Sequence, residues 1–343
     1  MRQLEGVRHI VVVPSGPLSS LPFGILVASA PPKIHKVADY RSVNWLAKRF
    51  AISVLPAVRS AEALRRPFVA GAVQEPFVGF GDPLVGFKAS VSHGNPSIPK
   101  SSEVSAPTSV RAGGLVDDTQ ALQDQGIADV SVIRQADRVK ATAEELRKIA
   151  TILRGNQKAV YLQANATETN VKRIDLTKYR IIAFATHGYM AGEMDGVGEA
   201  GLVLTPPVHG TAADDGYLAA SEIARLKLNA EWVILSACNT AATDGTPGAD
   251  GLSGLAKAFF YAGARSLLVS HWSVASDATV ALTTIMLRAY QTNPNLGKAE
   301  ALRKATLALM ANPARPEYAH PYFWAPFVVA GEGGPADQKP LTR

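Results

Sequence analysis

The sequence predicts an α/β fold, a mostly parallel sheet with helices on both faces. Short apolar runs alternate with helical patterns along almost the whole chain, as in consecutive strand–helix–strand units. Several runs are continuously apolar, which is typical of strands buried on both faces. Strands are expected at residues 9–13, 51–55, 76–80, 159–162, 180–185, 202–204, 231–236, 266–270 and 326–329.

Helical patterns fill the intervals, and several carry end signals. Thr142 with Glu145 three residues later matches a capping box. Ser276 followed by Asp277 suits a helix start, and Gly263 suits a helix end. The expected helices are 142–154, 219–226, 252–262, 276–291 and 296–310.

The domain organisation follows from breaks in this rhythm. We expect one domain over residues 1–330, with a smaller N-terminal layer at about 1–83 and a catalytic part at about 140–330. Residues 84–126 begin with a stretch rich in Ser, Pro and Gly, which predicts an exposed insertion. The polar residues 331–343 predict a flexible tail.

Composition excludes several classes of protein. The 343 residues are 47% hydrophobic, which excludes wholesale disorder, and 35 Lys+Arg against 29 Asp+Glu give a net charge of only +6. A single cysteine excludes an intrachain disulfide and a cysteine-based zinc site. No long apolar run or signal peptide is evident. We therefore expect a cytoplasmic protein that binds neither membrane nor nucleic acid.

Two residues that could perform catalysis follow buried strands. His187 comes after the strand at 180–185, and Cys238 comes after the strand at 231–236. Ligands of an open parallel sheet bind outside the carboxyl ends of its strands, so neighbouring strands would bring the two side chains together. A lone Cys or a His beside a Gly is more often structural, but the two together at equivalent strand ends indicate a dyad.

The chemistry of such a dyad requires an activated thiol. A free thiol has a pKa of about 8.5 and is only slightly ionised at neutral pH, so an adjacent imidazole is needed to take its proton. Gly188 leaves its N–H unobstructed, and the N–H groups of Gly188 and Cys238 could form an oxyanion hole.

An ordered set of motifs around these residues resembles the CHAT domain family, caspase-like peptidase domains related to separases and often found with tetratricopeptide repeats. The resemblance covers nearly the whole chain. Its motifs are VVVPSG at 11–16, LPF at 21–23, ATHG at 185–188, EAGLVL at 199–204, DGYLAASEI at 215–223, LSACNT at 235–240, GLSGLA at 251–256, AGARS at 262–266, Trp272, and HPYFWAPF at 320–327.

The resemblance implies a caspase–haemoglobinase fold with Cys238 as nucleophile, His187 as general base and acid, and Gly188 as an oxyanion donor. It implies no metal or organic cofactor. Two features depart from the family pattern. Ser273 follows Trp272 where Pro or Asp is common, and no tetratricopeptide repeat precedes the domain. A separate repeat segment or regulatory protein is therefore an expected partner.

The charge distribution suggests a substrate class. The segments 188–224 and 239–256 contain acidic residues and no Lys or Arg. We therefore expect cleavage after a basic residue, a preference that separases share. Asp277 is one candidate for the base of the substrate pocket, with Asp244 and Asp250 as alternatives. Asp277 also fits a purely structural role at a helix N-terminus.

The sequence thus predicts a cysteine endopeptidase acting on protein substrates. An acyl transferase using the same dyad is one alternative, and a catalytically silent interaction module of a bacterial signalling or defence assembly is another. The insertion at 84–126 contains Lys100 and Arg111, which would suit self-processing, although a passive loop is the simpler interpretation.

Overall fold

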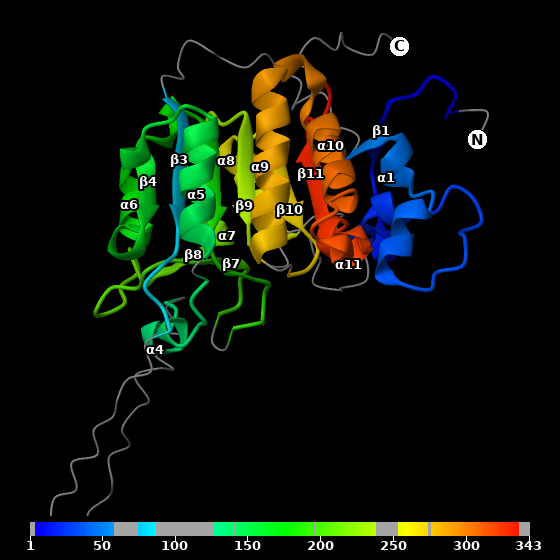
Figure 1. Ribbon diagram of the computed structural model, residues 1–343. Helices are drawn as coiled ribbons and strands as arrows, with labels where there is room; N and C mark the ends of the chain where they lie inside the picture. The colour runs from blue at the N-terminus through cyan, green and yellow to red at the C-terminus, as the bar shows by residue number, and fades with distance from the viewer. Residues whose placement is uncertain are drawn as a thin grey trace, which may run out of the picture.

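A twisted mixed sheet forms the centre of the molecule (Figure 1). The computed structural model describes residues 4–57, 75–86, 127–139, 141–194, 197–237, 253–273 and 276–335. Within these residues the sheet has eight strands in the order β1-β2-β11-β10-β9-β5-β3-β4. They are β1 (His9–Val12), β2 (Ala51–Val54), β3 (Glu75–Gly81), β4 (Val160–Leu162), β5 (Tyr179–Ala185), β9 (Trp232–Ser236), β10 (Ser266–Ser270) and β11 (Phe327–Gly331).

The pairing of these strands confirms the predicted fold class. Every neighbouring pair in the sheet is parallel except β10 with β11, which is antiparallel. The central strands are buried along most of their length, β10 throughout, because helices cover both faces. This double burial explains why their sequences are continuously apolar rather than alternating.

Helices on the two faces enclose two separate apolar cores. One face is covered by α5 (Ala141–Ile152), α9 (Ser276–Thr292) and α10 (Lys298–Met310), with α11 (Pro321–Trp324) beside them (Figure 1). The other face is covered by α6 (Glu168–Arg173), α7 (Ala220–Ile223) and α8 (Gly254–Ala262). The layered arrangement exposes the carboxyl ends of the strands between the two helical layers.

Smaller elements complete the described chain. A second sheet has the antiparallel order β6-β7-β8 and lies near α4 (Figure 1), with which it shares a small third core. Its strands and the remaining helices are β6 (Gly188–Tyr189), β7 (Gly201–Val203), β8 (Tyr217–Ala219), α1 (Leu46–Arg49) and α4 (Val130–Arg134). The described 3-10 turns are Gly16–Ser20, Phe23–Ile25, Val37–Ser42, Gln157–Ala159, Gln163–Asn165, Leu176–Lys178, Pro294–Leu296 and Pro316–Ala319.

The expected separate N-terminal layer at 1–83 is wrong. β2 pairs with β11, the last strand of the chain, and β3 lies between β5 and β4. The described strands of this segment, β1, β2 and β3, therefore all belong to the main sheet. Sequence order alone could not show this, because an apolar run carries no information about which strand it pairs with. Most of the predicted insertion, residues 87–126, lies outside the described residues.

The expected tail also begins too early. Gly331 is the last residue of β11, and Glu332 forms an ion pair with Arg265 at 2.9 Å. The carbonyl of Gly333 accepts a hydrogen bond from the N–H of Ala299 at 2.9 Å. These contacts hold residues 331–335 against the domain, and residues 336–343 lie outside the described residues.

The helix-end signals had different outcomes. Gly263 does end α8, in the left-handed region at φ 113°, where a Cβ would come within 2.3 Å of the Leu228 carbonyl oxygen. The capping box is wrong: α5 begins at Ala141, so Thr142 is already inside the helix, and its hydroxyl donates to the carbonyl of Val139. Glu145 is thereby free for contacts outside its own helix.

Among the helices that the structure describes, none has both the length and the apolar character needed to cross a bilayer.

Candidate functional site

A polar cleft of about 190 Å³ lies at the carboxyl ends of β5, β9 and β10. This is the edge of a parallel sheet at which ligands usually bind. Six of its described lining residues carry hydroxyl groups, while Glu145 is the single carboxylate among them. The described lining residues are Val139, Ala141, Thr142, Glu145, Thr186, His187, Ser236, Ala237, Ser270, Trp272, Ser273, Thr279 and Phe327.

The strand register brings the predicted dyad segments together. β5 and β9 are parallel neighbours, with Ala185 directly opposite Ser236. His187 lies two residues after Ala185 and lines the cleft. Cys238 lies outside the described residues, but Ala237, to which it is bonded, lines the same cleft. The two strands are therefore neighbours, which is the condition under which the sequence predicts that the dyad side chains meet.

The imidazole of His187 is held by the main chain. Its Nε2 is in hydrogen-bond contact with the carbonyl oxygen of Asp137. Because a carbonyl oxygen only accepts, Nε2 must carry the proton in this contact, and the neutral ring then has its lone pair on Nδ1. The arrangement fixes both the tautomer and the ring orientation that a general base requires.

The backbone around His187 is also anchored. The carbonyl of His187 accepts a hydrogen bond from the N–H of Val203 at 2.9 Å, and the hydroxyl of Thr186 donates to the carbonyl of Val203 at 2.5 Å. The predicted oxyanion donor Gly188 is buried at the start of β6, beside this anchor. The small sheet therefore holds the histidine segment against the end of the main sheet.

Both residues that precede Cys238 are fixed by side chains from other elements. The hydroxyl of Ser270 on β10 donates to the carbonyl of Ala237 at 2.8 Å. The hydroxyl of Ser236 donates to Oε2 of Glu145 on α5, also at 2.8 Å. The end of β9 is thus pinned from the neighbouring strand and from the helix above it.

Glu145 is a buried acid of this cleft that the sequence does not single out as a site residue. Its side chain is 2% exposed, and its second oxygen, Oε1, lies 3.0 Å from the hydroxyl of Thr283 on α9. Burial raises its pKa to about 7, against the opposing effect of the hydroxyls of Ser236 and Thr283. The spacing of Glu145 from Thr142 matches a capping box, so the sequence suggests a helix-capping role for this acid. It gives no sign of the contacts that Glu145 makes with Ser236 and Thr283 at the cleft.

None of the three acids expected to contact substrate is among the described residues that line the cleft. Asp277 lies in the first turn of α9 and is not among the described lining residues. Its carboxylate pairs with Arg315 at 2.6 Å and accepts a hydrogen bond from the hydroxyl of Tyr318 at 2.9 Å. These contacts favour the helix N-terminal role. Asp244 and Asp250 lie outside the described residues.

The acidic segment 188–224 does not provide an acid-only surface at the cleft. Glu222 pairs with Lys172 at 2.7 Å, and Asp215 accepts hydrogen bonds from the N–H groups of Ala128 and Tyr217 at 2.7 and 2.8 Å. Other carboxylates of this segment likewise accept from main-chain N–H groups, namely Glu193, Glu199 and Asp214. Asp195 lies outside the described residues. The described carboxylates of segment 188–224 therefore form no acid-only surface at the cleft, and residues 239–252 lie outside the described residues.

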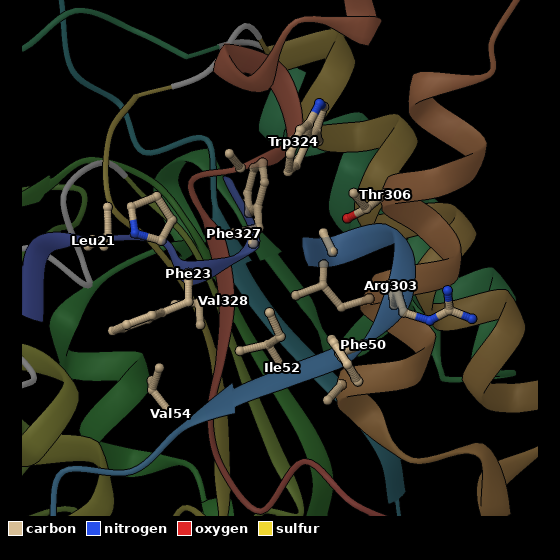
Figure 2. Close-up of a pocket in the computed structure, with 16 residues that line it drawn as sticks. Leu21, Phe23, Phe50, Ile52, Val54, Arg303, Thr306, Trp324, Phe327 and Val328 are labelled. Carbon is tan, nitrogen blue, oxygen red and sulfur yellow. The ribbon is translucent and has the colours of Figure 1, made fainter. Parts of the chain in front are cut away.

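A second cavity of about 50 Å³ lies near the β2 side of the sheet (Figure 2). Apolar side chains dominate its wall, among them Phe23, Phe50 and Trp324. Arg303, its charged lining residue, already pairs with Glu300 at 2.6 Å. This cavity therefore offers no reactive group, and the polar cleft is the better candidate for an active site.

No group of three or more His, Cys, Asp or Glu side chains is arranged to hold a metal ion in the part of the chain that the structure describes.

Comparisons with known proteins bear on this site. No curated protein matches the chain. The solved structures that resemble it include two with 10% identity and a TM-score of 0.49 each: the Arg-specific cysteine proteinase gingipain R, and a complex of the pro- and mature domains of RgpB from Porphyromonas gingivalis. They cover 97% and 98% of this chain, which spans 66% and 67% of theirs. The model of the CHAT domain matches residues 1–332, so the chain belongs to the CHAT domain family.

Proposed function

We propose that this protein is a caspase-like cysteine endopeptidase with Cys238 as nucleophile and His187 as general base and acid. One observation carries the proposal: His187 lines a cleft at the end of β5, beside the end of β9 that leads directly to Cys238. The contact between Nε2 and the Asp137 carbonyl leaves Nδ1 as the basic atom. Membership in the CHAT family supports the same assignment.

The reaction follows from these roles. Nδ1 of His187 takes the thiol proton of Cys238, and the sulfur attacks the carbonyl carbon of the scissile peptide bond. Main-chain N–H groups, with those of Gly188 and Cys238 as candidates, stabilise the resulting oxyanion. The imidazolium then gives its proton to the leaving amine, and the C–N bond breaks to leave a thioester. Water, deprotonated by His187, releases the acid and regenerates the thiol.

We propose further that the residue before the scissile bond is basic. The support is the polar cleft, in which Glu145 is the carboxylate and no Lys or Arg occurs among the described lining residues. An acyl transferase would use the same thioester with an amine in place of water. Product analysis with a competing amine distinguishes the two reactions.

The test compares wild type with Cys238→Ala and His187→Ala on fluorogenic peptides that differ only in the residue before the cleaved bond. We expect both substitutions to reduce cleavage by roughly 10³-fold or more, because each removes a member of the dyad. Faster cleavage after Asp than after Arg would contradict the basic preference.

Iodoacetamide provides the control for a catalytically silent module. An activated Cys238 should alkylate faster than free cysteine at pH 6.5, because a thiol with a normal pKa is almost entirely protonated there. Reactivity no greater than that of free cysteine, together with no cleavage of any peptide, would support the interaction-module alternative instead.

A further inference from the structure

Glu145 differs from the other buried acids of the described structure in having neither a described cation nor a described main-chain N–H beside it. Asp82 pairs with Arg138 at 2.8 Å, and Glu168 pairs with Lys172. Asp215 accepts from the N–H groups of Ala128 and Tyr217. Among the described residues, no Lys, Arg or His lies within ion-pair distance of Glu145. Its two oxygens contact the hydroxyls of Ser236 and Thr283. A buried carboxyl group without a counter-charge is costly once it ionises, so its retention calls for a reason.

The location of Glu145 suggests that reason. It lines the same cleft as His187. Its hydrogen-bond partner Ser236 is the last residue of β9 and lies two residues before Cys238 in the chain. The cleft volume of about 190 Å³ is below the ~300–1,000 Å³ of pockets for drug-sized ligands, and suits a single side chain. The acid is therefore placed where one side chain of a substrate would enter beside the reacting bond.

We propose that Glu145 is the specificity-determining residue of this cleft, and that it binds the guanidinium or ammonium group of the residue preceding the scissile bond. The proposal rests on the proposed function, since it assigns a substrate residue to the proposed active site. It replaces Asp277, Asp244 and Asp250 as the acid that selects a basic residue.

The remaining lining residues suit such a group. Each carboxylate oxygen of Glu145 has one hydroxyl contact and retains a lone pair for a further donor. Hydroxyls of Thr142, Ser270 and Ser273 line the cleft and can accept the other N–H groups of a guanidinium. Trp272 adds aromatic surface for the aliphatic part of the side chain, and its ring is fixed by a hydrogen bond to the Tyr322 carbonyl at 3.1 Å.

The contacts of Glu145 accommodate both of its protonation states. Oγ1 of Thr283 also lies 2.9 Å from the carbonyl oxygen of Thr279, so its single proton can go either to that carbonyl or to Glu145. In the empty cleft a protonated Oε1 can donate to Thr283. When a cation enters, Glu145 loses its proton to solvent and Thr283 donates to the carboxylate. The ligand then supplies the charge that the protein lacks.

The experiment measures covalent labelling by peptidyl chloromethyl ketones that end in Arg, Lys or Leu. The sulfur of Cys238 attacks the methylene carbon and displaces chloride, and intact mass reports the thioether. We expect the Arg and Lys ketones to label wild type faster than the Leu ketone. Glu145→Gln should slow the Arg ketone by about 100-fold, since an unpaired charge in a buried site costs roughly that much, and should slow the Leu ketone far less.

Glu144→Gln is the matched control. Glu144 is the neighbouring residue on α5, 67% exposed and paired with Lys148 at 2.6 Å, so the same substitution there should leave all three rates at wild-type values. Glu145→Asp provides a second variant should the Gln variant fail to fold. It keeps the charge but shortens the reach, and should lower the ratio of Arg to Leu labelling without abolishing it.

The outcomes separate the two proposals. Equal labelling of wild type by all three ketones would overturn the role of Glu145. Labelling by none of them would overturn Cys238 as the nucleophile and, with it, the role of Glu145 that rests on that assignment. An equal loss of Arg and Leu labelling in Glu145→Gln would also overturn the role of Glu145, because it would mean that Glu145 only positions Ser236. Selective Arg labelling that depends on Glu145, without hydrolysis of any peptide, would uphold the Glu145 site and overturn the peptidase.

Discussion

Two buried glutamates on opposite faces of the main sheet show how the same residue type can serve the architecture or a ligand. Glu168, on α6, is 1% exposed, and Glu145, on α5, is 2% exposed. Glu168 is surrounded by fixed donors: Lys172 on the next helical turn, and the N–H groups of Asp215 and Gly216 at 3.0 and 3.1 Å. Glu145 contacts two hydroxyls and a cleft.

The difference lies in what neutralises each charge. Burial raises the pKa of Glu168, while the hydrogen bond from Lys172 opposes that rise, so the fold supplies the counter-charge itself. Burial also raises the pKa of Glu145, but there the opposing hydrogen bonds come from the neutral hydroxyls of Ser236 and Thr283. The charge of a buried acid that has its own lysine is balanced within the fold. A buried acid at the wall of a cleft that has no such lysine needs a cationic ligand to balance its charge.

The largest effect that separates the two sites is expected on stability. Glu168→Gln leaves Lys172 without its closest carboxylate and weakens acceptance from two main-chain N–H groups. We expect a loss of about 3 kcal/mol in the free energy of unfolding, since removing one member of a buried pair costs ~3–5 kcal/mol and Lys172 is partly exposed. Urea unfolding measures it. A change in the free energy of unfolding within about 0.5 kcal/mol, as for an ordinary surface substitution, would show that Glu168 is not a structural acid of this kind.

A smaller effect concerns pH. The pKa of Glu145 rises from 4.5 to about 7 on folding because the side chain is buried, so the folded state holds this proton more tightly than the unfolded state. Stability from this group is therefore fully present below pH 4.5 and decreases as pH rises towards 7, by at most about 3 kcal/mol. Glu145→Gln should lack this decrease.

Urea unfolding at pH 4.5 and at pH 7.5 provides the measurement, and the difference between the two pH values is compared across variants. Glu144→Gln should retain the wild-type difference, because Glu144 is exposed. A pH dependence in Glu145→Gln equal to that of wild type would show that Glu145 does not carry the buried proton.

The sequence predicted those features that depend on local pattern. The central strands, the helices after them and the left-handed Gly263 all follow from apolar periodicity and glycine geometry. The position of His187 after the end of a buried strand also follows from the sequence, whereas the pairing of that strand with the strand before Cys238 comes from the structure.

Features that depend on long-range pairing could not be predicted in this way. β2 joins β11 across most of the chain, and no residue in either run signals that partner. The acids of segment 188–224 predict a substrate-facing surface, but in the structure Lys172 and main-chain N–H groups from other segments bind described members of this set. Glu145 was hidden for the same reason: its hydroxyl partners, Ser236 and Thr283, lie far away in sequence.

The most direct measurement is the set of cleavage sites that wild type and Glu145→Gln produce in a random peptide library, identified by mass spectrometry. We predict Arg or Lys immediately before the bonds cut by wild type, loss of that preference in Glu145→Gln, and no cleavage by Cys238→Ala. Wild-type cleavage after Asp or apolar residues, or an unchanged basic preference in Glu145→Gln, would contradict the account.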